Sequence, residues 1–210
     1  MKLKLYYRPG TCALASFLAL EEAGADYEAV DVSDQLDLLA SLNPRAKVPV
    51  LEVDGRILRE NVAILSFIAR RFPVSALLPQ DPFEEAQCLS TAAWFASTLH
   101  IDYRRFLKPA VYSPERAARD AISAEGALQY ACDLDELDQQ LRGKTWLHGE
   151  QRSVADLYGL VFVDWAHRSA LYEPKWSGID QWVERLRQRP AVARVLKIMG
   201  SPLVAGDKKC

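Results

Sequence analysis

Apolar and polar positions change their period repeatedly in the first quarter of the chain. Residues 3–7 read Leu-Lys-Leu-Tyr-Tyr, an apolar run typical of a strand, and residues 27–32 form a second such run. Between them, residues 12–23 have the pattern of a helix that ends at Gly24. A strand, a helix and a second strand in this order predict a βαβ unit with two parallel strands.

The next segment has the pattern of a β-hairpin followed by a helix. Residues 47–53 and 56–59 are strand-like runs separated by Asp54-Gly55, a dipeptide that favours a two-residue turn. Asn61 is expected to cap a helix over residues 62–71. A short helix over residues 34–41 is also expected, so the predicted order is β-α-β-α-β-β-α.

From residue 83 onward the pattern is helical throughout. Residues 72–82 hold three prolines and are expected to be a connector. Ser153-Val154-Ala155-Asp156 resembles a capping box at a helix start. The expected domains are an α/β domain over residues 1–72 and an all-helical domain over residues 83–200. Its predicted helices span residues 83–107, 114–141, 157–170, 178–188 and 191–199.

Composition and charge exclude several classes of function. The chain has 210 residues, is 50% hydrophobic and carries a net charge of −2. A strongly basic field for nucleic acid or an anionic membrane is therefore not expected. No stretch reaches the roughly 18 apolar residues of a membrane helix, and a strand at Leu3 leaves no room for a signal peptide. We expect a cytoplasmic protein.

The cysteines do not have the spacing of a metal site or of a disulfide framework. Four cysteines are spread over the chain, with only three histidines. No metal is expected. Cys88 and Cys132 fall in helical stretches and are interpreted as packing residues, and the terminal Cys210 as incidental.

Cys12 is different, because it stands where a strand turns through Pro9-Gly10 into a helix. Free N–H groups and the helix dipole at a first helical turn favour a thiolate, which is the nucleophilic form. Ala15 occupies the place of the second cysteine of a dithiol redox motif. A disulfide at Cys12 would therefore need an external thiol. The alternative is a small buried cysteine that begins a helix.

Two further positions are suited to holding a peptide-like ligand. Pro49 interrupts an apolar run and lacks an N–H, so it lies at the beginning or edge of a strand, or follows a cis bond. A cis bond would turn the N–H and C=O of Val48 outward to pair with an extended peptide. Glu60 and Asn61 combine a carboxylate with a helix N-terminus, which suits the two charges of an α-amino acid. An edge proline and a solvated acid beside a cap are the alternatives.

A polar stripe in the second domain is a further candidate. Ala93, Ser97, His100 and Arg104 recur at helical spacing and are expected to share one face of a helix. His100 there could donate a hydrogen bond or act as a base of near-neutral pKa, or could simply be a surface histidine.

Aromatic residues late in the chain complete the candidate set. Trp165 and Tyr172 could wall an apolar pocket, although aromatic residues at such spacing also build cores. His148 and His167 are interpreted as structural.

Taken together, these motifs resemble the cytosolic glutathione transferases, and among them the bacterial beta class. The resemblance spans essentially the whole chain. It is carried by the motifs of residues 5–15 (LYYRPGTCALA), 43–51 (NPRAKVPVL), 60–64 (ENVAI) and 153–156 (SVAD). It implies a thioredoxin-like N-terminal domain followed by an all-helical domain, a bacterial homodimer, and a role in detoxification.

The resemblance also implies roles for individual residues. Glutathione would be the co-substrate, its cysteinyl part paired with Val48 beside a cis Pro49, and its γ-glutamyl end held by Glu60 and Asn61. The catalytic residues would be Cys12 and Tyr7 from the first domain and His100 from the second. The pocket for a small hydrophobic or electrophilic substrate would include Ser97, Arg104 and Trp165.

Three departures from the beta-class pattern bear on the expected activity. Asn61 stands where serine is usual in the wider family, Ala93 stands where a polar residue is expected, and the segment after Val32 is short. The leading hypothesis is conjugation of glutathione to small electrophiles, or thiol–disulfide exchange through Cys12. The alternatives are a non-catalytic binding or regulatory protein and a glutathione-dependent isomerase or lyase.

Overall fold

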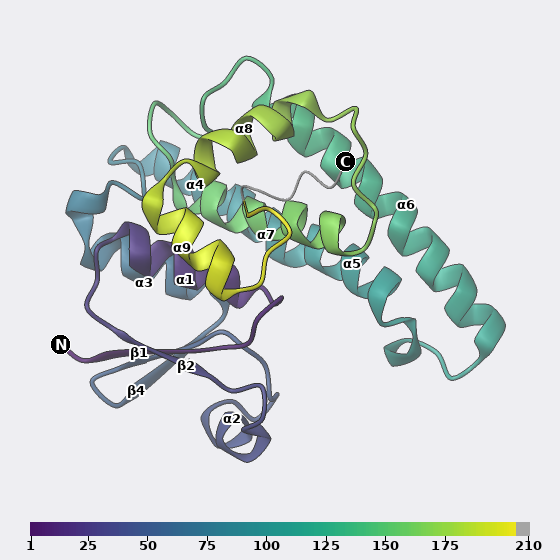
Figure 1. Cartoon of the computed structure of the whole chain (residues 1–210), viewed down its shortest axis with the longest axis horizontal. Helices are drawn as coiled ribbons and strands as arrows, with labels where there is room; N and C mark the ends of the chain where they lie inside the picture. The colour runs from purple at the N-terminus through teal and green to yellow at the C-terminus, as the bar shows by residue number, and fades with distance from the viewer. Residues whose placement is uncertain (205–210) are drawn as a thin grey trace.

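The N-terminal part of the chain is built around a four-stranded sheet with the strand order β2-β1-β3-β4 (Figure 1). The computed structural model describes residues 1–204. The strands are β1 (Leu3–Tyr7), β2 (Glu28–Asp31), β3 (Val50–Val53) and β4 (Arg56–Arg59). The helices among them are α1 (Ala13–Glu22), α2 (Leu36–Leu42) and α3 (Asn61–Arg71).

The register of the sheet confirms the predicted βαβ unit and hairpin. β1 runs parallel to β2, which α1 connects, and antiparallel to β3. Asp54 and Gly55 between β3 and β4 both have positive φ, of 49° and 79°. Two positive φ values in a two-residue turn match the right-handed twist of the paired strands. Helices α1 and α3 pack on the sheet and on each other, and α2 lies on the other side of the strands in Figure 1.

The rest of the described chain is helical, which confirms the predicted fold class. Its helices are α4 (Pro82–Trp94), α5 (His100–Leu107), α6 (Arg116–Leu141), α7 (Val154–Arg168), α8 (Ser177–Arg187) and α9 (Pro190–Ile198). Short 3₁₀ turns occupy Pro73–Ser75 and Pro109–Val111. None of the described helices is long and apolar enough to cross a membrane.

Local sequence explains where two of these helices begin. Asp81 accepts hydrogen bonds from the N–H groups of Phe83 and Glu84, and Pro82 occupies the first turn of α4. At α7, the capping box is confirmed, with the Ser153 N–H donating to the Asp156 carboxylate at 2.7 Å. α7 is buried along almost its whole length and contacts both α1 and α4.

One irregular turn was not predicted. The helix expected over residues 83–107 is interrupted by a π turn at Phe95–Leu99, between α4 and α5. A π turn holds more residues than an α-helical turn. Positions before it are therefore rotated relative to positions after it, which changes the faces that sequence spacing assigns.

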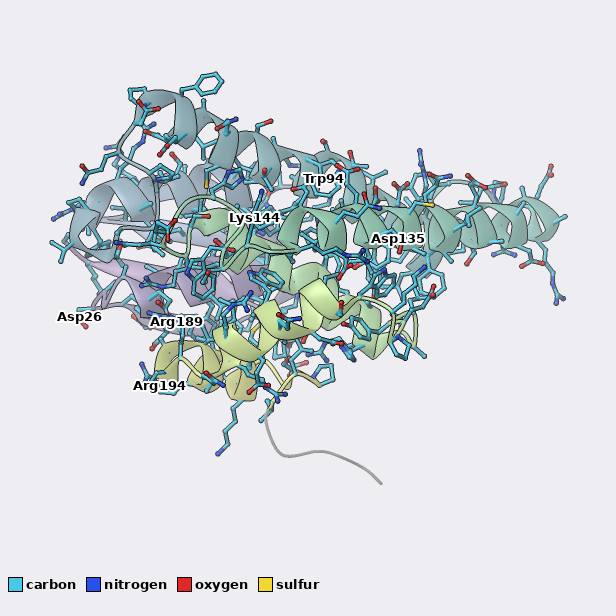
Figure 2. All side chains as sticks on the ribbon, turned by 90° about the horizontal axis from the view of Figure 1, so that it is seen from above. Asp26, Trp94, Asp135, Lys144, Arg189 and Arg194 are labelled. Atoms are coloured by element: carbon cyan, nitrogen blue, oxygen red, sulfur yellow. The ribbon has the colours of Figure 1, made fainter. Side chains whose placement is uncertain are left out.

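α6 projects beyond the other helices at one end of the molecule (Figures 1 and 2). Cys132 on α6 is exposed, so its interpretation as a packing residue was wrong. Cys88 on α4 is fully buried, as expected. Cys210 lies outside the described residues.

A buried acid joins the two parts of the chain. The Glu22 side chain at the end of α1 is only 2% exposed and forms ion pairs with Arg152 and Arg189 of the helical part. Arg189 caps α9, and Arg194 farther along α9 pairs with Glu21 at 2.8 Å. Figure 2 shows Arg189 and Arg194 along this side of the molecule.

Candidate active site

A cavity of about 590 Å³ lies where the sheet domain meets the helices. It is lined by the Cys12 loop, the loop around Val48, the start of α3, and the faces of α5 and α7. Eight of the residues proposed from the sequence are brought together here: Cys12, Val48, Pro49, Glu60, Asn61, His100, Arg104 and Trp165.

Cys12 immediately precedes α1, but the helix dipole is not the only influence on the pKa of its thiol. The Sγ atom is buried and donates to the carbonyl oxygen of Val48 at 3.6 Å. Burial raises the pKa of Cys12 to about 12, and the nearby Glu60 also raises it, while backbone N–H groups, Lys47 and Asn61 act in the opposite direction. Burial outweighs the effect of the helix terminus, so the structure favours a neutral thiol at Cys12 where the sequence predicted a thiolate.

The Val48–Pro49 peptide bond is cis, as the resemblance implied. The preceding loop is held by Asn43, whose Nδ2 donates to the Lys47 carbonyl at 2.8 Å. The Val48 N–H donates to no acceptor among residues 1–204. Its backbone therefore offers the cavity a free donor beside a carbonyl oxygen that Cys12 partly occupies.

Glu60 and Asn61 differ in how they meet the cavity. Glu60 rather than Asn61 is the cap of α3, and its φ of 70° is unfavourable for a residue with a side chain. Such a conformation costs on the order of 1–3 kcal/mol and is concentrated at functional sites. The exposed Glu60 carboxylate pairs with Arg45 at 2.9 Å.

The side chain of Asn61 has a positioning role in the structure. Its Nδ2 donates to the Cys12 carbonyl at 2.9 Å, and its Oδ1 accepts from Ser16 at 2.6 Å. Both ends of the amide are thus used within the protein. Asn61 therefore holds the Cys12 loop against α3.

His100 begins α5 and packs against the aromatic wall of the cavity. Its ring meets Trp165 edge-on, with 5.0 Å between the ring centroids. Burial, together with the positive charges of Lys47 and Arg104, lowers the pKa of His100 to about 4. The prediction of a base of near-neutral pKa was wrong, and His100 is a neutral imidazole near pH 7.

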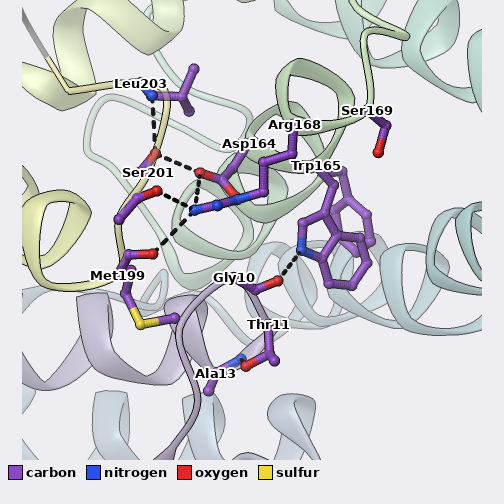
Figure 3. Close-up of polar contacts among 12 residues, drawn as sticks. Gly10, Thr11, Ala13, Asp164, Trp165, Arg168, Ser169, Met199, Ser201 and Leu203 are labelled. Carbon is purple, nitrogen blue, oxygen red and sulfur yellow. Dashed lines mark hydrogen bonds and ion pairs between the residues drawn. The ribbon is translucent and has the colours of Figure 1, made fainter. Parts of the chain in front are cut away.

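Trp165 on α7 connects this wall to the loop that carries Cys12. Its Nε1 donates to the Gly10 carbonyl at 3.1 Å, as Figure 3 shows. Tyr103 stacks on the indole at 4.6 Å between centroids. In the same view, Arg168 pairs with Asp164 at 2.6 Å and donates to the Gly200 carbonyl at 2.8 Å. The helical domain thereby fixes the turn that begins α1.

Three residues expected at the site lie elsewhere. Ser97 is exposed and donates to the Ala93 carbonyl, because the π turn rotates it away from the face of His100. Tyr7 points from β1 toward α1, where its ring meets Phe17 at 5.0 Å. Tyr172 stacks on His167 at 3.9 Å, away from the cavity lining.

Several lining residues were missed by sequence reasoning. Tyr158 on α7 lies near Cys12, and burial raises the pKa of its phenol. Tyr158 lies in an almost wholly apolar helix, so the pattern of polar and apolar positions did not mark the face that lines the cavity. The basic residues Arg8, Lys47 and Lys108 also line the cavity. These residues are far apart in the sequence and come together only in the folded chain. The net charge of the whole chain, which is close to zero, gave no sign of a basic cluster.

Comparison with known proteins agrees with this geometry. The glutathione S-transferase N-terminal domain matches residues 1–70, and the C-terminal domain of the same family matches residues 106–190. Glutathione S-transferase GstA of Escherichia coli O157:H7 is 29% identical over 209 residues, covering 94% of this chain and 99% of that protein.

Solved structures of bacterial enzymes are similar over nearly the whole chain. A sphingomonad glutathione S-transferase complexed with glutathione is 32% identical with a TM-score of 0.84, and covers 94% of this chain and 98% of its own. The beta-class glutathione S-transferase of Sphingomonas chungbukensis is 31% identical with a TM-score of 0.83, at the same coverage. The chain therefore belongs to the glutathione S-transferase family and is similar to bacterial enzymes of the beta class.

Proposed function

We propose that this glutathione transferase binds reduced glutathione along the Val48 loop and joins its sulfur to a small electrophile in the interdomain cavity. The observation that carries the proposal is the meeting of Cys12, Val48 and Glu60 on one cavity, opposite an aromatic wall. The non-catalytic alternative is set aside, because the chain is an enzyme of this family. An isomerase or lyase reaction stays an alternative, which activity assays with a panel of substrates would test.

The cavity offers a partner for each part of glutathione. The free Val48 N–H and its C=O suit the cysteinyl backbone, as in strand addition. The Glu60 carboxylate suits the α-ammonium group, and the first N–H groups of α3 suit the α-carboxylate. Basic residues on the Cys12 side, Arg8 and Lys47, suit the glycyl carboxylate.

This placement gives Cys12 the role of a hydrogen-bond donor. With its pKa raised to about 12, Cys12 stays a neutral thiol near pH 7 and is a weak nucleophile. A neutral S–H can stabilise a neighbouring glutathione thiolate, which then attacks the electrophilic carbon as the leaving group departs with its electron pair. The raised pKa of Cys12 favours conjugation over thiol–disulfide exchange through this residue.

Calorimetry with reduced glutathione tests the binding site. We expect binding in the millimolar range or tighter, and a loss of roughly threefold to tenfold in Glu60→Gln, since one exposed charge pair is removed. Glu125→Gln on α6 is a matched control on an exposed carboxylate that does not line the cavity. The absence of any binding heat at millimolar glutathione would contradict the proposal.

Alkylation separates the two roles of Cys12. Iodoacetamide near pH 7 is expected to modify the exposed Cys132 and spare Cys12, as mapped by peptide mass spectrometry. Faster modification of Cys12 would instead indicate a thiolate and favour thiol–disulfide exchange.

The proposal extends to assembly and setting. A homodimer is supported by apolar side chains exposed beside the connector, with Val74 99% and Phe83 72% exposed. Light scattering would test this state. A glutathione-dependent enzyme that removes electrophiles fits a detoxifying role in a reducing cytoplasm.

A further inference from the structure

The lining of the cavity has an excess of positive charge. Five basic side chains face one acidic side chain, Glu60; they are Arg8, Arg45, Lys47, Arg104 and Lys108. The chain as a whole has a net charge of −2. The excess is therefore a property of the cavity and does not reflect composition.

Four of these five cations are not neutralised by acids. Arg45 pairs with Glu60, whereas the other four form no ion pair with any of residues 1–204. Arg8 makes a single long hydrogen bond, from Nη2 to the Ala46 carbonyl at 3.3 Å, and its Nε is buried without a partner among these residues. Unpaired like charges in a concave, partly apolar site focus a positive potential that draws in anions.

The cations fall into two groups by their position in the fold. Arg8 and Lys47 lie on the sheet domain beside Cys12 and Val48, where glutathione is proposed to bind. Arg104 and Lys108 come from the last turn of α5 and the residue after it, four positions apart, and so share one side of the helix end. The glycyl carboxylate of glutathione accounts for the first group, and the second group is left without a partner.

The surroundings of the second group are apolar and aromatic. Leu107 and Val111 line the same part of the cavity and are 51% and 58% exposed. The Arg104 guanidinium lies 5.9 Å from the centroid of the Tyr112 ring. Deeper in the cavity stands the wall of Tyr103 and Trp165. An aromatic body with an anionic end is the ligand that complements this arrangement.

We propose that the second substrate is an aromatic electrophile carrying a carboxylate or a similar anionic group, bound through Arg104 and Lys108. This inference rests on the proposed function and specifies its electrophile. The ring lies against Trp165 while the anion meets the two cations at the mouth. The glutathione sulfur forms a bond to the ring carbon, a halide leaves with its electron pair, and the carboxylate is unchanged.

The test compares two electrophiles that differ in one charge, 4-chloro-3,5-dinitrobenzoate and its methyl ester. Each kcat/KM is divided by the rate constant of the uncatalysed reaction with glutathione, which removes differences in intrinsic reactivity. We expect the wild type to prefer the benzoate about tenfold, as two partly screened charge contacts allow. High salt should reduce this preference.

The double variant Arg104→Gln/Lys108→Gln should lose that preference. The KM for the benzoate is expected to rise about tenfold, while kcat/KM for the ester and the KM for glutathione stay within about twofold. Lys197→Gln removes an exposed charge on α9, outside the cavity, and should change nothing. Circular dichroism confirms that each variant is folded.

Equal normalised rates for benzoate and ester in the wild type would overturn the inference. In the double variant, an equal fall in kcat/KM for the benzoate and the ester would also overturn it, and so would a raised KM for glutathione. Calorimetry with 3,5-dinitrobenzoate in the absence of glutathione separates the two proposals. Selective binding of this anion without any glutathione binding would contradict the proposed function and support the anion site. Glutathione binding without a preference for the anion would support the proposed function and contradict the anion site.

Discussion

The indole Nε1 of Trp165 donates to the carbonyl oxygen of Gly10 at 3.1 Å, across 155 positions of sequence. This bond joins α7 of the helical domain to the turn that presents Cys12. Gly10 has a φ of 71°, a conformation that side chains disfavour, so the turn depends on both its sequence and its partner. The loop that carries Cys12 is therefore positioned by a helix from the other domain.

Trp165→Phe is expected to impair catalysis more than stability. The variant keeps an aromatic wall and removes only the donor, which costs about 1 kcal/mol of unfolding free energy. A shifted Gly10 turn would lower kcat/KM by about tenfold, since small displacements of a site are costly. Denaturant unfolding and steady-state kinetics measure the two effects.

Trp94→Phe is the control for that prediction. Trp94 is half-buried, and its indole makes no hydrogen bond with the described residues. Both variants losing activity equally would show that Trp165 acts only through packing.

Removal of the Cys12 thiol is expected to slow conjugation without abolishing glutathione binding. Cys12→Ala loses one donor to a charged sulfur, worth roughly 1.5–3 kcal/mol, which corresponds to a fall of about 10-fold to 100-fold in kcat/KM. Cys12→Ser keeps a donor and should recover much of this loss. Loss of glutathione binding in Cys12→Ala would contradict the assigned role.

The pH dependence of turnover should show no step from His100. Burial and the charges of Lys47 and Arg104 lower the pKa of His100 to about 4, so the imidazole is neutral throughout the range from about pH 5.5 to 8. The profile of kcat/KM is expected to keep its shape in His100→Gln, whatever the change in its height. A limb near pH 6.5 that this substitution removes would refute the prediction.

A carboxyl pair between α5 and α6 should make stability fall as pH rises. Burial, then Asp102 and Glu136, raise the pKa of Asp133 to about 7, and the Oδ2 of Asp133 is buried without a partner among the described residues. Because the folded pKa exceeds the unfolded value near 4, the folded state binds the proton more tightly, and stability is lost between about pH 4 and pH 7.

Asp133→Asn removes this dependence. Its Tm is expected to exceed that of the wild type by a few degrees at about pH 8, with a smaller difference or none at about pH 5. Asp120→Asn, on the exposed part of α6, is the control. The same Tm difference at both pH values would show that Asp133 is not the titrating group.

Local patterns were sufficient to predict most of the fold. The Asp54-Gly55 turn, the Ser153–Asp156 capping box and the apolar period of each helix are properties of neighbouring residues. Element bounds differ from those expected by a few residues only. The domain boundaries at residues 72 and 83 stay predictions.

The site was harder to predict, because its chemistry depends on contacts between distant segments. Spacing placed Ser97 beside His100, but the π turn at Phe95–Leu99 breaks the period on which that argument relied. The helix terminus at Cys12 was recognised correctly, yet the burial that reverses its effect on the pKa comes from packing. The sequence did not predict the cluster of basic residues that lines the cavity, because its members are brought together only by the fold.

The ion pairs of Glu22 affect how cooperatively the two domains unfold. If the two domains separated, this carboxylate would lose both guanidinium partners, and the apolar side chains that α1 packs against α7 and α9 would meet water. Partial opening is therefore disfavoured relative to complete unfolding. The sheet and the helical bundle should melt together, as one cooperative unit without a half-folded intermediate.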